Sequence, residues 1–181
     1  SADDEIDGTV SLLRERGVLD ETLVIVTSDN GYLWGEHGRH AKFVPYEPSV
    51  RVPLLVRWPE RVPGGVDAGR QVSYLDILPT VLAAAGVQPD PDRPLDGESL
   101  LSPSKRDTVY AEYWLDSANG SMPTWRMART PAAKYVQIYD EAGKVTFREY
   151  YDLAVDPTEE LNLLGDDDPA NDPPSDVVAD F

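Results

Sequence analysis

Cysteine is absent from all 181 residues of this chain. Its absence excludes disulfide bonds, thiolate metal ligands and cysteine nucleophiles within these residues, and it leaves the redox compartment open. Long apolar runs are also missing, because none approaches the roughly 18 residues needed to cross a bilayer. The first residues, Ser1–Glu5, lack the basic and apolar regions of a signal peptide. We therefore expect a soluble chain with no targeting segment, whose first residue need not be a natural start.

Positive charge is scarce. The chain has 16 Lys and Arg residues against 33 Asp and Glu residues, which gives a formal net charge of -17. Binding to nucleic acid or to an anionic membrane depends on clustered basic side chains, so neither partner is expected. The hydrophobic content of 41% is enough for a core of one to one and a half ordinary domains.

The first half of the chain alternates helical and strand patterns. Residues 4–16 carry apolar side chains at helical spacing and are followed by Gly17, which is placed to end the helix. Two short apolar runs, residues 23–26 and 52–58, are typical of buried strands. Residues 74–85 again show an apolar face at helical spacing. This alternation predicts an α/β layer built on a parallel sheet.

The second half differs from the first in composition. After the proline-rich stretch 88–94, four short aromatic-rich segments alternate with turn residues, and residues 139–144 resemble a hairpin loop. These features predict a small antiparallel sheet. Trp114 and Trp125 could form a sugar-stacking surface or pack in the core of that sheet. The stretch from Gly165 onward is acidic and rich in proline, which predicts a disordered tail.

Polar side chains gather directly after the first apolar run. Asp29, Asn30 and Gly31 are residues that commonly form a tight turn, and a turn is one explanation for them. The carboxylate of Asp29 and the amide oxygen of Asn30 are also hard oxygen donors of the kind that bind Ca²⁺ or Mg²⁺. The two explanations are compatible, because a turn could aim both oxygens in one direction.

The next fifteen residues contain basic and imidazole side chains. His37 and His40 are the only histidines in the chain, and either could be an ordinary surface or packed residue. Lys42 could likewise be a solvated charge. If this loop folds over the strand end, however, Lys42 and His37 would place cationic or proton-donating groups near a divalent ion, an arrangement that stabilises a tetrahedral oxyanion. Glu47 and Arg51 are four residues apart and are expected to form a structural pair.

At these residues the chain resembles the sulfatase family of the alkaline-phosphatase-like superfamily. The resemblance covers about residues 3 to 164 and depends on several separate motifs in the family's order. Those motifs are Thr22–Gly31, Gly35–Gly38 with Lys42 and Tyr46-Glu47, Val50–Leu54, Leu75–Thr80 with Gly86, Leu95–Leu100 and Tyr151–Leu163.

The resemblance implies a fold and a division of the chain. The fold would be α/β, part of an alkaline-phosphatase-like α/β/α sandwich followed by a small antiparallel-sheet α+β subdomain. Residues 1–88 would belong to the α/β catalytic domain, residues 89–164 to the small subdomain, and residues 165–181 to the acidic tail.

The resemblance also implies a chemistry. It is the hydrolysis of a sulfate ester by a formylglycine nucleophile, assisted by a calcium ion, with magnesium as a second option for the metal. Asp29 and Asn30 match metal ligands, Lys42 matches a lysine that binds the sulfate, and His37 lies where a histidine could act on the leaving group. The partner would be a sulfated small molecule or glycan. Intact members are often secreted, periplasmic or lysosomal.

The departure from the family pattern is large. The chain has no Cys, no Ser-x-Pro-x-Arg motif and no early Asp-Asp metal motif followed by a strand-helix run, so it resembles only the carboxyl-terminal part of a sulfatase. Asp29 and Asn30 alone would bind calcium weakly, and the chain alone is expected to be inactive. Two alternatives stay open: a phosphate or phosphonate ester hydrolase of the same superfamily, and a truncated, non-catalytic chain.

Overall fold

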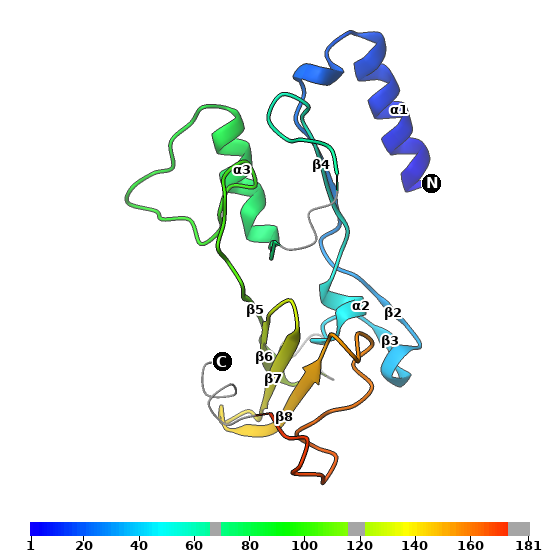
Figure 1. Ribbon diagram of the computed structural model, residues 1–181, viewed down its shortest axis with the longest axis vertical. Coiled ribbons are helices and arrows are strands. Elements are labelled where there is room, and N and C mark those ends of the chain that lie inside the picture. Colours follow the sequence, from blue (N-terminus) through cyan, green and yellow to red (C-terminus); the bar gives the residue numbers. More distant parts are fainter. Residues whose placement is uncertain (66–69, 116–121, 174–181) are drawn as a thin grey trace. The chain divides into compact units, whose positions relative to one another are not determined.

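The computed structural model describes residues 1–65, 70–115 and 122–173 (Figure 1). Its contacts divide the chain into two compact units. The first unit takes in Ser1–Ser28, the stretch that begins at Pro53, and Tyr74–Ser104. The second takes in Asp29–Val52, the stretch that ends at Ser73, and the chain from Lys105 onward. The predicted division into residues 1–88, 89–164 and 165–181 stays a prediction.

The first unit opens with helix α1, Ala2–Glu15. Ser1 and Asp4 form a capping box. The Ser1 hydroxyl accepts a hydrogen bond from the backbone N–H of Asp4, and the Asp4 carboxylate accepts one from the amino terminus. Gly17 follows the helix with φ +70°, a left-handed conformation that costs glycine little. The helix predicted over residues 4–16 is therefore confirmed, as is its glycine stop.

The two predicted strands exist, but they run in opposite directions. Strand β1, Val24–Thr27, pairs antiparallel with β4, Leu54–Arg57, and Val24 lies opposite Arg57. The expectation of a parallel arrangement is therefore wrong for this pair. A short apolar run predicts burial but carries no information on strand direction, which is decided by how the chain returns. Residues 29–52 return it through short strands and the four-residue helix α2, Glu47–Val50, and not through the long crossover helix that usually joins parallel strands.

The predicted helix over residues 74–85 forms in two parts, the 3₁₀ turn η3, Tyr74–Asp76, and helix α3, Ile77–Ala84. Gly97 lies so close to this helix that a Cβ there would be 2.0 Å from the Leu75 carbonyl oxygen. The buried Asp76 carboxylate accepts the backbone N–H of Glu98 at 2.8 Å. The motif around Leu75–Thr80 and the loop Leu95–Leu100 are thus two halves of one packed substructure.

The second unit contains the predicted antiparallel sheet, which has four strands in the order β5-β6-β7-β8. The strands are β5, Val109–Tyr113, β6, Thr124–Arg129, β7, Ala133–Tyr139, and β8, Val145–Asp152. The hairpin between β7 and β8 is closed by a hydrogen bond from the Asp140 N–H to the Lys144 carbonyl, and Gly143 has φ +78°. The hairpin predicted at residues 139–144 is confirmed.

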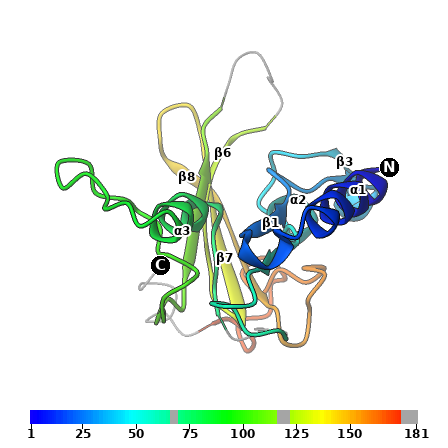
Figure 2. The same cartoon turned by 90° about the horizontal axis from the view of Figure 1, so that it is seen from above.

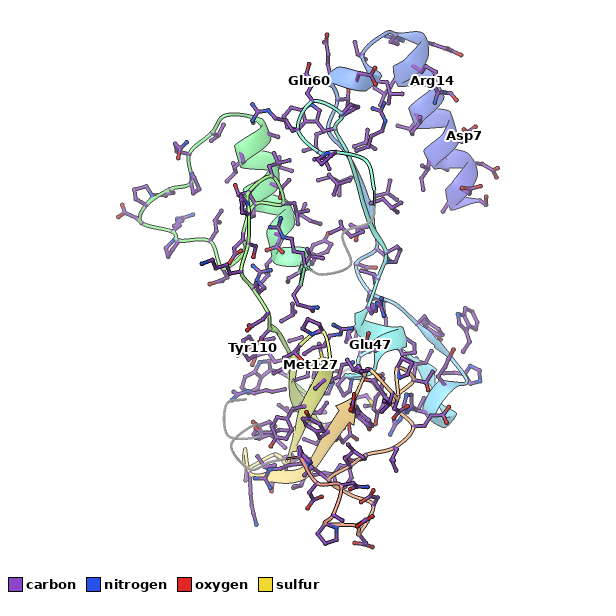
Figure 3. The ribbon with its side chains drawn as sticks, viewed as in Figure 1. Asp7, Arg14, Glu47, Glu60, Tyr110 and Met127 are labelled. Atoms are coloured by element: carbon purple, nitrogen blue, oxygen red, sulfur yellow. The ribbon has the colours of Figure 1, made fainter. Side chains whose placement is uncertain are left out.

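One face of this sheet carries the core of the second unit. Trp125, Met127 and Val136 are buried together, and Val50 of the short helix α2, Glu47–Val50, packs against them. Figure 2 shows α2 on one side of the sheet, and Figure 3 labels Met127 and Glu47. Core packing is confirmed for Trp125, whereas Trp114 is exposed.

Before α2 the chain forms a short hairpin of β2, Leu33–Trp34, and β3, His40–Ala41, joined by the 3₁₀ turn η2, Glu36–Gly38. Leu33 is fully buried and holds the hairpin to the unit. In the predicted tail, residues 165–173 contain bends and one turn but no helix or strand, and residues 174–181 lie outside the described residues. Within the described ranges, no helix combines the length and the apolar character needed to span a membrane.

Candidate active site

The chain bends at Asp29, and the segment Asp29–Gly31 packs against α2. The Asn30 N–H donates to Asp29 Oδ1 at 2.9 Å, and the Gly31 N–H donates to the Ser49 carbonyl at 2.8 Å. A Cβ on Gly31 would be 2.0 Å from the Pro48 carbonyl oxygen, so only glycine fits there. The tight turn expected for this sequence is not formed, because Gly31 has no positive φ and its N–H bonds to α2 instead of closing a turn. Packing against α2 fixes where the two neighbouring oxygen-bearing side chains begin.

Lys42 contacts Asn30, twelve residues earlier in the chain. Its Nζ donates to Asn30 Oδ1 at 3.2 Å, and it also lies 5.3 Å from the centre of the Phe43 ring. Both side chains are half-buried, which strengthens a hydrogen bond that carries a charge. The structure therefore brings together Asn30 and Lys42, two of the four predicted site residues. The Asp29 carboxylate contacts the backbone N–H of Asn30.

The donor set fits a metal only as part of a larger site. Ca²⁺ takes roughly six to eight oxygen ligands, and Asp29 and Asn30 supply hard oxygens from adjacent residues. Across residues 1–65, 70–115 and 122–173, no group of three or more His, Cys, Asp or Glu side chains is arranged to hold a metal ion. A cation bound here would need most of its ligands from outside these residues.

His37 contacts the ring of Tyr46. Its backbone is left-handed, with φ 52°, and its ring stacks on the ring of Tyr46 with centroids 3.9 Å apart and planes 9° apart. The Tyr46 hydroxyl in turn donates to Oε1 of the buried Glu149 on β8 at 3.0 Å. His40, the other histidine, is exposed on β3. The structure thus joins His37 to Tyr46 and, through it, to the sheet.

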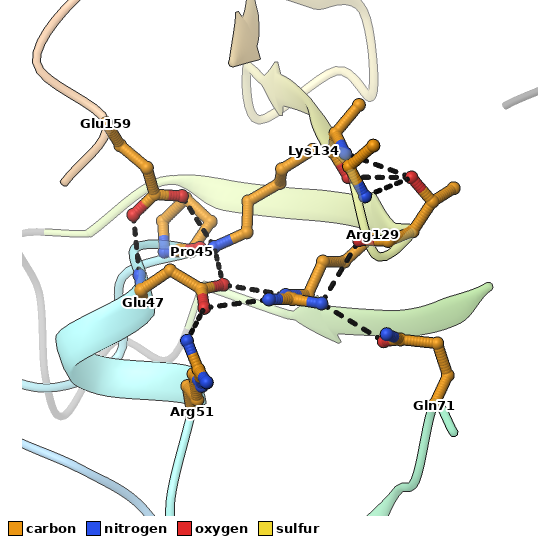
Figure 4. A network of polar contacts seen from close by, with 10 residues as sticks. Pro45, Glu47, Arg51, Gln71, Arg129, Lys134 and Glu159 are labelled. Atoms are coloured by element: carbon orange, nitrogen blue, oxygen red, sulfur yellow. Dashed lines mark hydrogen bonds and ion pairs between the residues drawn. The ribbon is translucent and has the colours of Figure 1, made fainter. Parts of the chain in front are cut away.

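The start of α2 is held to the sheet by a buried ionic network (Figure 4). Glu47 forms ion pairs with Lys134 at 2.7 Å and with Arg129 at 2.9 Å. Arg51 lies 3.6 Å from the same carboxylate, so the predicted pair with Glu47 is confirmed. It is the most exposed of the three contacts, because 72% of the Arg51 side chain is accessible while none of Lys134 is.

Glu159 completes the network from the far end of the sequence. Its Oε1 lies 2.6 Å from Lys134 Nζ, and its Oε2 accepts the backbone N–H of Glu47 at 2.6 Å. Lys134 also donates to the Pro45 carbonyl at 3.0 Å, and the Trp125 indole donates to the Phe43 carbonyl at 2.8 Å. Residues 43–47 are therefore fastened to the sheet through backbone and side chain alike.

The segment that carries Glu159 is itself a folded cap. The Asp156 carboxylate accepts the backbone N–H groups of Glu160 and Leu161 at 3.1 and 2.9 Å. Burial acts to raise the pKa of Asp156, but these backbone donors outweigh it and hold the pKa below its usual value. Asn162 accepts the Tyr150 N–H at 2.9 Å and so ties the segment to β8. The closing motif Tyr151–Leu163 therefore has a structural role, which is to present Glu159 to α2.

The pKa values of two buried glutamates, Glu47 and Glu149, are shifted in opposite directions. Burial opposes ionisation of Glu47, but the Arg129 hydrogen bonds and the charge of Lys134 outweigh it and hold its pKa below the usual value. Burial raises the pKa of Glu149, and the hydrogen bond from Tyr46 offsets only part of that effect. Glu47 is thus held as an anion, whereas burial favours the protonated form of Glu149.

Glu149 should make the protein less stable as pH rises. Between the usual pKa of a carboxyl group and the raised pKa of Glu149, the folded state binds more protons than the unfolded state, so the free energy of unfolding falls with increasing pH. Glu149→Gln should remove that component. Urea denaturation of both proteins across this pH range checks the prediction. The free energy of unfolding of the wild type minus that of Glu149→Gln should fall as pH rises, and a value that stays constant or increases would contradict the prediction.

No sequence pattern pointed to three residues on which this region depends. Lys134 and Glu149 lie in strands without a recognisable motif, and their partners are 89 and 103 residues away. Glu159 lies in the closing motif, but that motif does not reveal that its carboxylate reaches α2 over 112 residues.

The chain matches the family model described as N-sulphoglucosamine sulphohydrolase, C-terminal, over residues 35–172. It is 30% identical to the N-acetylglucosamine-6-O-sulfatase of Bacteroides thetaiotaomicron over 91% of this chain and 30% of that protein. It is 37% identical to arylsulfatase K of Bos taurus over 83% of this chain and 29% of that protein. The chain thus spans about 30% of the length of the curated relatives it matches.

Solved structures lead to the same family. One determined in complex with its substrate, D-glucosamine-2-N,6-O-disulfate, has a TM-score of 0.73 and 31% identity over 91% of this chain and 34% of its own. The phosphonate monoester hydrolase of Agrobacterium radiobacter has a TM-score of 0.75 and 32% identity over 93% of this chain and 36% of its own. The α/β architecture expected for the alkaline-phosphatase-like superfamily is confirmed by these likenesses. The chain belongs to the sulfatase family, and it matches the carboxyl-terminal part of that family's members.

Proposed function

We propose that this chain is the carboxyl-terminal part of a sulfuric ester hydrolase and contributes the sulfate-binding half of its active site. The observation that carries the proposal is the contact of 3.2 Å between Lys42 Nζ and Oδ1 of Asn30, the residue after Asp29. An ammonium group held beside one hard oxygen donor, with a second donor on the preceding residue, is suited to a bound oxyanion that also touches a cation.

Each residue has a distinct part in this proposal. Lys42 binds sulfate oxygens and stabilises the negative charge that develops on them as the ester bond breaks. Asp29 and Asn30 hold a calcium ion together with ligands from outside this chain, and magnesium is the second option. The ion, when bound, supplies Lewis-acid polarisation of the sulfate. His37 donates a proton to the departing alcohol oxygen.

The nucleophile is proposed to be a formylglycine that lies outside these residues. The chain contains no cysteine and no Ser-x-Pro-x-Arg sequence from which it could be made. The 181-residue chain alone is therefore expected to show no turnover of an aryl sulfate. Turnover by the chain alone would overturn this assignment.

The substrate is proposed to be a sulfated sugar or another small sulfate ester. A sugar is supported by the likeness to the N-acetylglucosamine-6-O-sulfatase of Bacteroides thetaiotaomicron and to a structure solved with D-glucosamine-2-N,6-O-disulfate. A phosphonate monoester is the second candidate, favoured by the 32% identity to the Agrobacterium radiobacter hydrolase. Specificity constants of the full-length protein for an aryl sulfate and for an aryl phosphonate monoester would decide between them.

Lys42→Met is the direct test of the sulfate-binding role. In the full-length version we expect kcat/KM for a sulfate ester to fall roughly 10²–10³-fold, as on removal of one donor to a developing oxyanion. Lys144→Met is the matched control, because Lys144 is exposed in the β7–β8 loop and should leave activity unchanged. If both variants retain wild-type kcat/KM, Lys42 does not bind the reacting sulfate.

A further inference from the structure

A continuous contact chain leads from His37 to strand β8. The His37 ring lies flat on Tyr46, with centroids 3.9 Å apart, and the Tyr46 hydroxyl donates to Glu149 at 3.0 Å. Tyr151, also on β8, packs edge-on against Tyr46 with centroids 6.4 Å apart. Burial raises the pKa of Tyr46 to about 12, so its hydroxyl keeps the proton that it donates at neutral pH.

We propose that Glu149 is a positioning residue that orients His37 through Tyr46. This inference rests on the proposed function, because it gives a purpose to the histidine assigned there to leaving-group protonation. Glu149 itself contacts neither the sulfate-binding lysine nor the metal ligands, and its effect on the reaction passes through the tyrosine ring.

The backbone around His37 cannot fix the imidazole by itself. His37 has the left-handed φ of 52°, and it lies between Gly35 and Gly38, whose φ angles are 142° and 66°. Short glycine-flanked turns leave a side chain free to change its direction unless something else holds it. A flat stack covers one face of the ring and leaves its edges, where both nitrogens lie, open for proton transfer. Tyr46 therefore restricts the plane of His37 without blocking its chemistry.

Glu149 is a carboxyl group buried beside apolar side chains. Its side chain is 4% exposed, and its neighbour across the sheet is the fully buried Val136. Burying a carboxyl group costs free energy unless it is paired and hydrogen-bonded. The charges near it partly cancel, because Arg39 favours its ionised form and Glu159 opposes it. An apolar residue here would avoid that cost, but it could not accept the proton of the Tyr46 hydroxyl.

The orientation of His37 can be measured by NMR. Its imidazole proton signals should be shifted upfield by the Tyr46 ring and are identified by their loss in His37→Gln. Tyr46→Leu should remove the upfield shift, and Glu149→Leu should reduce it. Glu149→Gln should preserve it, because the amide oxygen also accepts the hydroxyl proton. Tyr110→Leu, at an exposed position of β5, is the matched control and should change nothing.

The inference is overturned if the His37 signals are the same in the wild type and in folded Glu149→Leu. Should that variant fail to fold, Tyr46→Phe replaces it, because it keeps the ring and removes only the hydroxyl donor. An unchanged upfield shift in Tyr46→Phe also overturns the inference, and a reduced one supports it.

Turnover of the full-length protein separates this inference from the proposed function. We expect Tyr46→Phe to lower kcat with little change in KM, and His37→Ala to lower kcat at least as much. A loss of the stack without any loss of kcat would refute the positioning role. If His37→Ala keeps wild-type kcat while Lys42→Met loses activity, the role of His37 is wrong and the sulfate site stands.

Discussion

Replacing Lys134 by methionine is expected to lower the free energy of unfolding by about 3–5 kcal/mol, the cost of removing one partner from a buried ion pair. Lys134 is fully buried, and its Nζ lies 2.7 Å from Glu47 and 2.6 Å from Glu159. Methionine has a similar length and fills the space, but it leaves two buried carboxylates facing each other without the shared cation. A loss of this size is a large fraction of the stability of a typical domain.

Chemical denaturation followed by circular dichroism measures this loss. Lys144→Met makes the same chemical change at an exposed position and should shift the free energy of unfolding by no more than about 0.5 kcal/mol. If Lys134→Met were as stable as Lys144→Met, the ionic network would not be what holds α2 to the sheet. The contacts of Val50 with the apolar core would then be sufficient.

Asp29→Ala in the full-length version is expected to abolish turnover. Removing a carboxylate ligand should weaken calcium binding by at least ~10²-fold. Mutation of groups that only orient metal ligands already lowers metal affinity roughly 10–100-fold. Asp29→Asn should be milder, because it keeps an oxygen donor and the acceptor for the Asn30 N–H, and it loses only the charge. We therefore expect raised calcium to restore Asp29→Asn in part and to leave Asp29→Ala inactive.

Calorimetric titration with calcium gives this prediction a readout that does not depend on activity. Asp7→Ala is the control, because Asp7 is an exposed residue of α1 and its loss should change neither binding nor turnover. Wild-type calcium affinity in Asp29→Ala would refute the ligand assignment. Wild-type affinity with lost turnover would give Asp29 another role in the reaction.

Local patterns predicted the individual elements well. The helix near the amino terminus, the two short apolar strands, the helix over residues 74–85 and the antiparallel sheet all form. Each depends on neighbouring residues, such as the spacing of apolar side chains or a glycine that can take a positive φ. The direction of β4 relative to β1 was predicted wrongly, because an apolar run looks the same in parallel and antiparallel pairs.

The sequence by itself determined which chemical groups are available: a carboxylate and an amide after an apolar run, a lysine and a histidine soon after, and no cysteine. Those groups lie within fourteen residues of one another, so motif and spacing were sufficient to name them. Only the tertiary structure decided which of them meet and what holds them. Lys42 reaches Asn30 and His37 stacks on Tyr46, whereas Lys134, Glu149 and Glu159 arrive from strands and loops more than eighty residues away. Hydrogen bonds and ion pairs depend on distance in space, and no periodicity along the chain records that distance.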